Sequence, residues 1–94
     1  MGIEHVSGRD GGKVMLYALS TCVWCKKTKA LLDELGVAYD YEYVDLLQGE
    51  EEKKAMDDVR HWNPRCSFPT LVINNKCIVG FMEKDIRGAL SGRS

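Results

Sequence analysis

Two cysteines, Cys22 and Cys25, are separated by two residues and follow the end of an apolar run at residues 14–19. The run breaks at Ser20-Thr21, and the segment after Cys22 has the apolar spacing of a helix. The first turn of a helix has free N–H groups and a positive dipole end, and both favour a thiolate over a thiol. We therefore predict that Cys22 is nucleophilic near neutral pH and exchanges disulfides together with Cys25.

The same cysteines have an alternative use as half of a structural zinc site, which needs four ligands. The residues available to complete it are Cys66, Cys77, His5 and His61. They contain no second closely spaced pair, so the pattern favours redox chemistry over metal binding. We expect Cys66 to be an inert loop residue, with a sensor or second-disulfide role as the alternative, and Cys77 to be a small buried residue.

Length and composition place the chain among small globular domains. It has 94 residues, 45% of them hydrophobic, and its formal net charge of -1 gives no general attraction for nucleic acid. We predict a flexible lead-in over residues 1–12 and one domain over residues 13–94. The lead-in has no apolar core of a signal peptide, and no run is long enough to cross a membrane. One close cysteine pair suits a reducing compartment, so we expect a cytoplasmic monomer.

The elements that position the dithiol follow from local patterns. Residues 14–19 lack alternation, as expected of a central strand covered on both faces. Hydroxyl groups of Ser20 and Thr21 are the expected cap of the helix after Cys22, and Gly36 is its expected end. Aromatic and acidic residues alternate over residues 39–45, which predicts a strand with one exposed face.

The second half of the chain predicts a helix, a hairpin and a last helix. Residues 50–61 form the helix, which Asn63-Pro64 ends. Residues 70–73 and 76–79 are short strands joined by an Asn74-Asn75 turn, and a helix follows Gly80. The order β-α-β-α-β-β-α predicts an α/β fold with a four-stranded mixed sheet flanked by helices. Chemistry is expected at the carboxyl ends of its parallel strands, where Cys22 lies.

Three motifs in this order resemble the glutaredoxin family of the thioredoxin fold over roughly residues 13–90. They are Thr21-Cys22-Val23-Trp24-Cys25, Ser67-Phe68-Pro69-Thr70 and Ile78-Val79-Gly80-Phe81. The resemblance implies that Cys22 attacks a protein or small-molecule disulfide and that Cys25 resolves the mixed disulfide. It also implies that Pro69 is a cis-proline and that Phe68 offers its backbone to an extended substrate.

The resemblance has three departures. Val23-Trp24 lacks the family's proline and is closer to the Cys-Val-Gln-Cys of NrdH-type redoxins. Leu19 stands where glutaredoxins carry a lysine or arginine for glutathione, and Gly80-Phe81 replaces Gly-Gly. Side chains that could partly compensate are Lys26, Arg65 and Glu83. The electron donor therefore stays open between glutathione and a flavin or ferredoxin-linked reductase, and no tightly bound cofactor is expected.

The resemblance and the spacing together nominate a substrate site. Its residues are Thr21, Trp24, Lys26, Phe68, Pro69, Gly80 and Phe81. Trp24 is expected either to contact partner proteins or to pack on Trp62 or Tyr17. Some glutaredoxins bind an iron–sulfur cluster between two subunits, so a metal or cluster module that uses the same cysteines is the alternative function.

Overall fold

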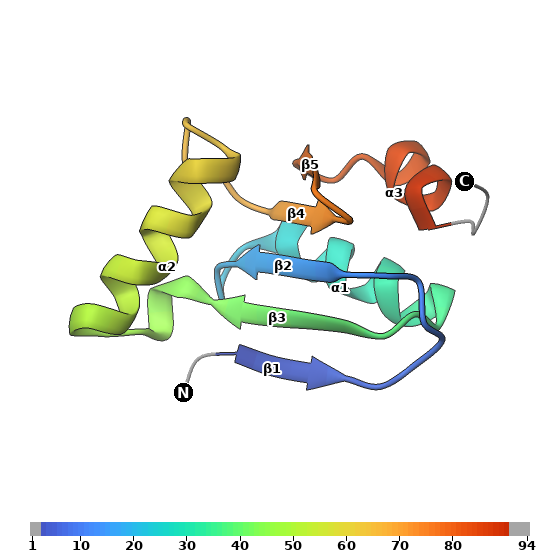
Figure 1. Cartoon of the computed structure of the whole chain (residues 1–94), viewed down its shortest axis with the longest axis horizontal. Coiled ribbons are helices and arrows are strands. Elements are labelled where there is room, and N and C mark those ends of the chain that lie inside the picture. The colour runs from blue at the N-terminus through green and yellow to red at the C-terminus, as the bar shows by residue number, and fades with distance from the viewer. Residues whose placement is uncertain (1–2, 91–94) are drawn as a thin grey trace.

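Five strands and three helices make up residues 3–90, the part of the chain that the computed structural model describes (Figure 1). In chain order the elements are β1 (Ile3–Val6), β2 (Val14–Ala18), α1 (Val23–Leu35), β3 (Tyr39–Tyr43), the short 3-10 helix η1 (Val44–Leu46), α2 (Gly49–Trp62), β4 (Thr70–Ile73), β5 (Lys76–Val79) and α3 (Glu83–Leu90). No helix within this range is long and apolar enough to span a membrane.

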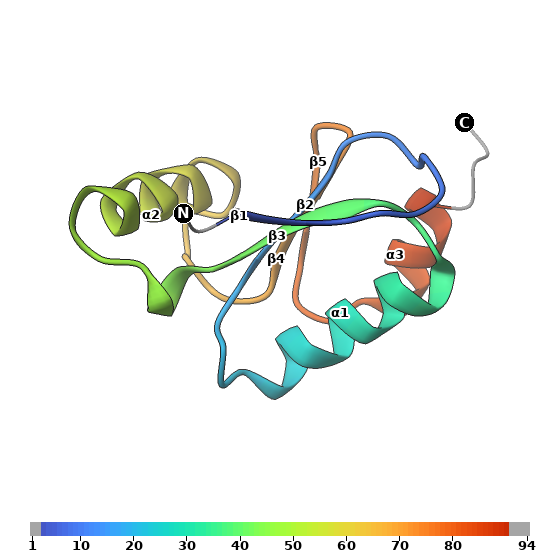
Figure 2. The ribbon, with the colours of Figure 1, turned by 90° about the horizontal axis from the view of Figure 1, so that it is seen from below.

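The strands form one mixed sheet in the order β1-β3-β2-β4-β5. β2 is central and pairs in parallel with β3, and the other neighbours are antiparallel. Helices α1 and α3 lie on one face and α2 lies on the other, as the view along the sheet shows (Figure 2). The predicted thioredoxin-like α/β architecture is confirmed.

The sheet has five strands where the sequence predicted four. Ile3–Val6, within the expected flexible lead-in, forms β1 and pairs antiparallel with β3 from Ile3↔Glu42 to Val6↔Tyr39. Without it, β3 would present a row of unpaired N–H and C=O groups at the edge of the sheet. Backbone pairing places few demands on side chains, and β1 is largely exposed, so its composition gave no core signal.

Local turn chemistry is confirmed where it was predicted. Gly36 ends α1 in the left-handed conformation with φ 71°, and its N–H donates to the Asp33 and Leu32 carbonyls. Asn74 and Asn75 both have positive φ, 48° and 71°, as a two-residue hairpin turn requires. The third strand is shorter than predicted, because the chain turns into η1 after Tyr43.

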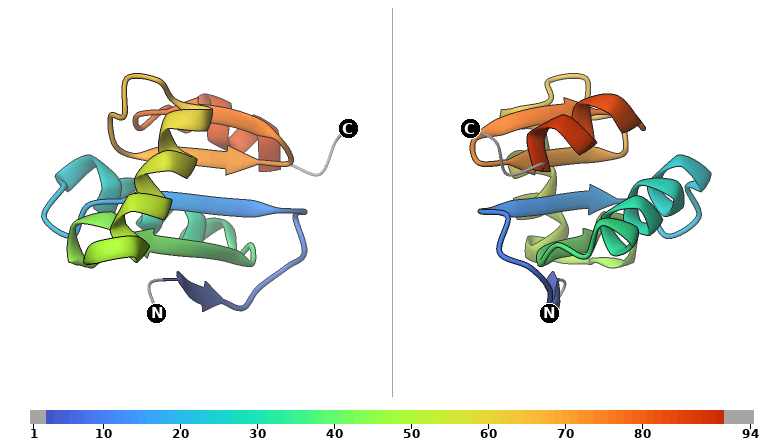
Figure 3. Two further views of the ribbon diagram at one scale, coloured as in Figure 1. Left: turned by 60° about the vertical axis from the view of Figure 1, so that its left-hand side comes forward. Right: turned by 90° about the vertical axis from the view of Figure 1, so that its right-hand side faces the viewer.

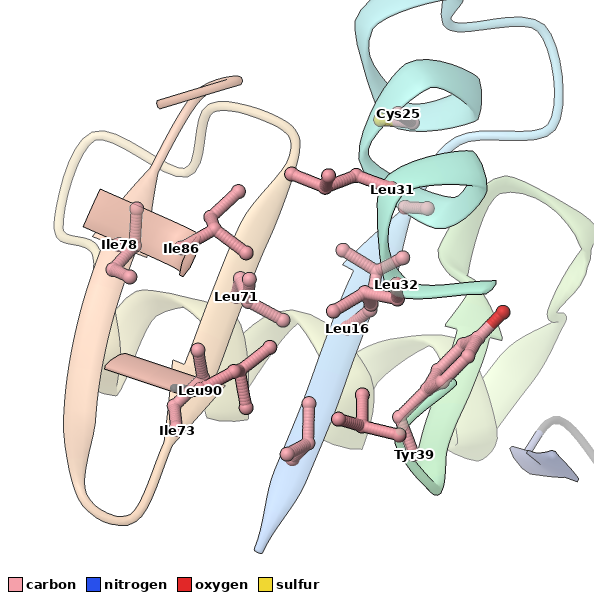
Figure 4. Packing of buried hydrophobic residues seen from close by; sticks show 13 residues of the cluster. Leu16, Cys25, Leu31, Leu32, Tyr39, Leu71, Ile73, Ile78, Ile86 and Leu90 are labelled. Carbon is pink, nitrogen blue, oxygen red and sulfur yellow. The ribbon is translucent and has the colours of Figure 1, made fainter. Parts of the chain in front are cut away.

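Alternate side chains of β2 belong to two different cores. Helices cover both faces of the sheet, with α2 on one face and α1 and α3 on the other (Figure 3). Leu16 faces the core under α1 and α3, which the close view shows packed from both helices and the neighbouring strands (Figure 4). Tyr17 faces the smaller core under α2, with Val59 and Val72. Cys25 belongs to the first core, so the second cysteine of the pair is anchored in the larger of the two cores.

Candidate active site

Four chain segments meet at one end of the sheet. β2 and β3 are parallel and in register at Ala18↔Tyr43, so both end there. β4 runs antiparallel to β2, with Tyr17 opposite Thr70, so β4 begins at that end. β5 runs antiparallel to β4 and ends there too. The loop with the dithiol, η1, the loop before Thr70 and the loop after β5 are therefore neighbours.

Cys22 is the N-cap residue of α1, with extended backbone (φ −84°, ψ 120°). Its sulfur accepts a hydrogen bond from the Cys25 backbone N–H at 3.2 Å. The prediction that hydroxyl groups of Ser20 or Thr21 cap this helix is wrong, because the Ser20 hydroxyl is engaged elsewhere and the sulfur itself fills the capping position. Negative charge on a capping atom is favoured by the free N–H groups and dipole of the first turn.

Cys25 is the protected sulfur of the pair, with 1% of the residue exposed, whereas Cys22 is only half-buried. Burial raises the pKa of the Cys25 thiol to about 12, helped by the hydrogen bond with Cys22 and by the negative charges of Cys22 and Asp45. Both cysteines are free thiols in the structure. The pair therefore consists of one accessible sulfur and one buried, protonated sulfur.

Asp45 is a site residue that the sequence analysis missed. One carboxylate oxygen accepts the Ser20 backbone N–H at 2.8 Å, and the other accepts the Ser20 hydroxyl at 2.6 Å. These two bonds lower the pKa of Asp45 below its ordinary value. Ser20 and Asp45 each lie two residues beyond the register pair Ala18↔Tyr43 of two parallel strands, and this register, which the fold sets, brings them together.

The loop before β4 is built around Asn63, which is only 4% exposed. Its side-chain amide donates to the Ser67 carbonyl (3.1 Å), the Ser67 hydroxyl (3.0 Å) and the Thr70 hydroxyl (3.1 Å). The Phe68–Pro69 bond in this loop is cis, as the resemblance implied. Sequence reasoning assigned Asn63 only to the end of a helix, because a buried amide that holds a loop has no local sequence signature.

Trp24 projects from the start of α1 and is 56% exposed. Its ring stacks on Phe81, with centroids 6.1 Å apart and an interplanar angle of 25°, so the alternative of packing on Trp62 or Tyr17 is wrong. Lys27 Nζ lies 5.6 Å from the centre of the Trp24 ring. Beside this stack is a cleft of about 240 Å³ lined by Trp24, Phe68, Pro69, Gly80 and Phe81.

Five of the seven residues nominated for substrate binding therefore line one cleft next to the dithiol. The backbone N–H of Gly80 donates to the Pro69 carbonyl at 2.9 Å, which ties the end of β5 to the cis-proline loop. Thr21 and Lys26, the other two, are exposed beside the cysteines but do not line the cleft.

The remaining cysteines do not line the cleft. Cys66 packs against the core under α2, in a left-handed backbone conformation with φ 54°. Cys77 lies on β5, and burial raises the pKa of its thiol. Within residues 3–90, no group of three or more His, Cys, Asp or Glu side chains is placed to hold a metal ion. The ligand set of the zinc alternative is therefore not assembled in the described part of the chain.

Comparisons with known proteins agree with this geometry. The glutaredoxin family model matches residues 14–78. A crystallised glutaredoxin from Methanosarcina mazei Go1 is 60% identical, with a TM-score of 0.88 over 96% of this chain and 88% of that one. Crystallised Methanosarcina acetivorans methanoredoxin is 56% identical, with a TM-score of 0.88 over 96% and 95% of the two chains. Glutaredoxin 1 of Rickettsia bellii (strain RML369-C) is 35% identical over 68 residues, which are 71% of this chain and 67% of that protein.

A thioredoxin-like sheet with two thiols at the start of its first helix defines a class of redox proteins. Within that class, the chain belongs to the glutaredoxin family. Membership of the family supports thiol–disulfide oxidoreductase activity in general.

Proposed function

We propose that the protein is a dithiol electron carrier that reduces protein or small-molecule disulfides through Cys22 and Cys25. The observation that carries this proposal is the hydrogen bond from the Cys25 backbone N–H to the Cys22 sulfur at 3.2 Å. It places an accessible sulfur at the N-cap of a helix, where negative charge is favoured, and a protected sulfur one turn behind it.

In the first step, the Cys22 thiolate attacks one sulfur of the substrate disulfide. A Cys22–substrate disulfide forms, the substrate S–S bond breaks, and the leaving substrate thiolate takes a proton from solvent. Cys25 does not compete for this step, since its pKa is raised to about 12 and its sulfur is buried. The difference between the two sulfurs therefore assigns the roles of nucleophile and resolving thiol.

In the second step, Cys25 loses its proton to water and attacks the Cys22 sulfur. A Cys22–Cys25 disulfide forms, and the second substrate thiolate leaves, so two electrons pass from the protein to the substrate. Two causes of the raised Cys25 pKa, the hydrogen bond and the charge of Cys22, involve a free Cys22 sulfur. Both disappear when Cys22 enters the mixed disulfide, which makes Cys25 easier to ionise at the moment when it must attack.

Seven residues are proposed to bind the substrate around these sulfurs. Phe68 and Pro69 present the cis-proline loop, Trp24, Gly80 and Phe81 complete the cleft, and Thr21 and Lys26 flank the cysteines. An external donor must return two electrons to the Cys22–Cys25 disulfide after each turnover. Glutathione and a protein reductase are the two candidate donors, and we propose that the protein works in the cytoplasm as a monomer, without nucleic acid and without a tightly bound cofactor.

Reduction of insulin disulfides in the presence of dithiothreitol tests this function. Cys22→Ser should lower the rate of insulin reduction by at least about 10³-fold, because an alcohol does not replace a thiolate in disulfide exchange. Cys66→Ser and Cys77→Ser are the matched controls and should keep the wild-type rate. Full activity in Cys22→Ser, or equal losses in all three variants, would refute the proposal.

A further inference from the structure

One wall of the cleft beside the dithiol is a stack of two aromatic rings. Trp24 lies between the two cysteines in sequence and stacks on Phe81 from the loop after β5. Lys27 holds its ammonium group 5.6 Å from the centre of the Trp24 ring, a cation–π contact that limits the motion of an exposed side chain. Phe68 and the buried Pro69 also line the cleft. The cleft is therefore a preformed apolar slot.

Size and polarity restrict what this slot can hold. Its volume is about 240 Å³, below the roughly 300–1,000 Å³ typical of sites that enclose a whole small molecule. None of its five lining residues carries a charge. The slot thus suits one apolar side chain, and the Lys27 ammonium lies over the Trp24 ring without lining the slot.

Three further apolar residues are exposed on the elements that meet at this end of the sheet, although they do not line the slot. Val23 at the start of α1, Val79 at the end of β5 and Met82 just before α3 are large apolar residues that are exposed. These three elements border the dithiol end of the sheet. Exposed aromatic and apolar residues near a reactive group are typical of surfaces that bind other proteins.

We propose that the slot selects the substrate: it receives one large apolar side chain next to the half-cystine of a protein disulfide and disfavours glutathione disulfide. This inference rests on the proposed function and specifies its substrate class. When Cys22 attacks, the substrate chain is joined to its sulfur, and a residue adjacent to the substrate cysteine reaches the slot formed by Trp24. Glutathione has glycine and a γ-linked glutamate beside its cysteine, so it supplies carboxylates and no apolar side chain.

Single-turnover reactions with matched peptides test the proposal without an electron donor. The full chain is reduced, freed of reductant, and mixed with disulfide-linked dimers of acetyl-Phe-Cys-Gly-amide or acetyl-Gly-Cys-Phe-amide, or of the same peptides with Ser in place of Phe. One protein dithiol consumes one peptide disulfide and yields two peptide thiols and a Cys22–Cys25 disulfide. Glutathione disulfide is a further substrate, and each rate constant is divided by that for 2-hydroxyethyl disulfide.

The wild type should reduce at least one Phe peptide about tenfold faster than its Ser counterpart, the ratio that about 1.4 kcal/mol of differential binding gives. Glutathione disulfide should be slower than that Phe peptide. Trp24→Ala and Phe81→Gly should each lower the Phe/Ser ratio below about twofold, because each removes an aromatic wall of the slot. Trp24→Phe should keep most of the ratio, and Ile3→Ala, which removes an exposed apolar residue at the far edge of the sheet, should keep all of it.

Two results would overturn the inference while leaving the proposed function intact. One is equal reduction of the Phe and Ser peptides in both sequence positions by the wild type. The other is a rate for glutathione disulfide above that for every Phe peptide. If the reduced protein reacts with none of the disulfides, the proposed function fails and the inference fails with it. Near-ultraviolet circular dichroism of each variant checks that the loss of selectivity is not a loss of fold.

Discussion

The dithiol at the start of α1 and the two other cysteines differ in their surroundings more than in their exposure. Cys22, Cys66 and Cys77 are all half-buried free thiols. Only the Cys22 sulfur accepts a backbone N–H at the first turn of a helix, with a second thiol behind it. Exposure alone therefore does not distinguish Cys22 from the other two half-buried thiols. Placement at a helix start, where several loops meet, does.

Cys25 and Cys77 make the same point for buried sulfur. Burial is the first cause of the raised pKa in both thiols. For Cys77 it is the only cause, whereas Cys25 also interacts with Cys22 and Asp45. The pKa of Cys25 can therefore change when Cys22 loses its charge or forms a disulfide, whereas the pKa of Cys77 depends on burial alone.

Replacing the buried thiol should give an all-or-none effect. Cys25→Ser removes the resolving sulfur, so Cys22 should remain joined to the substrate, and intact-mass spectrometry should detect a stoichiometric mixed disulfide after reaction with a peptide disulfide. Cys77→Ser should release both peptide thiols and form no stable adduct. If Cys25→Ser releases its substrate as fast as the wild type, another thiol resolves the mixed disulfide, and the difference between Cys25 and Cys77 is refuted.

The hydrogen bonds of Asn63 in the loop before β4 should contribute strongly to the free energy of unfolding. Asn63→Ala removes a buried amide with three hydrogen-bond acceptors and should lower the free energy of unfolding by about 2–3 kcal/mol. Gln48→Ala, which removes an exposed amide that makes no capping bond at the start of α2, should change it by less than about 0.5 kcal/mol. Urea unfolding monitored by circular dichroism measures both values. Equal effects would mean that the Asn63 bonds contribute nothing.

The raised pKa of Cys25 predicts a specific alkaline loss of stability. The pKa of Cys25 rises from 9.0 to about 12 on folding. The stabilisation that the protonated thiol gives to the folded state is therefore fully present below pH 9 and is lost progressively as the pH rises towards 12. Under reducing conditions, the unfolding free energy of the wild type should therefore fall more steeply over this range than that of Cys25→Ala. Tyr17, whose pKa is also raised to about 12, contributes equally to both proteins and cancels in the difference. Parallel curves would contradict the assignment.

Replacement of Asp45 should give the smallest effect on the rate of disulfide exchange, and it tests whether the Asp45–Ser20 bonds hold the loop before Cys22. Asp45→Asn weakens the bonds to Ser20 and should slow disulfide exchange by about two- to fivefold, because the Cys22 loop is held less firmly. The stability that Asp45 contributes should be present at neutral pH and disappear as the pH falls below 3.8 through its lowered pKa. Asp57→Asn, which breaks an exposed ion pair with Arg60 on α2, is the control and should leave the exchange rate unchanged.

Several of these features follow from sequence patterns, and others do not. The central strand, the helix after Cys22, the Gly36 end and the Asn74-Asn75 turn depend on neighbouring residues, so local rules predict them. β1 depends on an edge of β3 that lies more than thirty residues away, as the pair Ile3↔Glu42 illustrates. The capping atom of α1 also differed from the prediction, because Asp45 takes up the Ser20 hydroxyl.

Residue order alone identifies two thiols spaced to lie at a strand-to-helix junction, with an x-Pro-Thr segment and a hairpin after them. These are local choices of backbone conformation and residue type. The surroundings of the two thiols, namely the Asp45–Ser20 bonds, the Asn63 amide and the Trp24–Phe81 wall, arise when the chain folds. Most of these contacts join segments far apart in the chain, and strand register and helix packing, which are properties of the whole fold, bring them together.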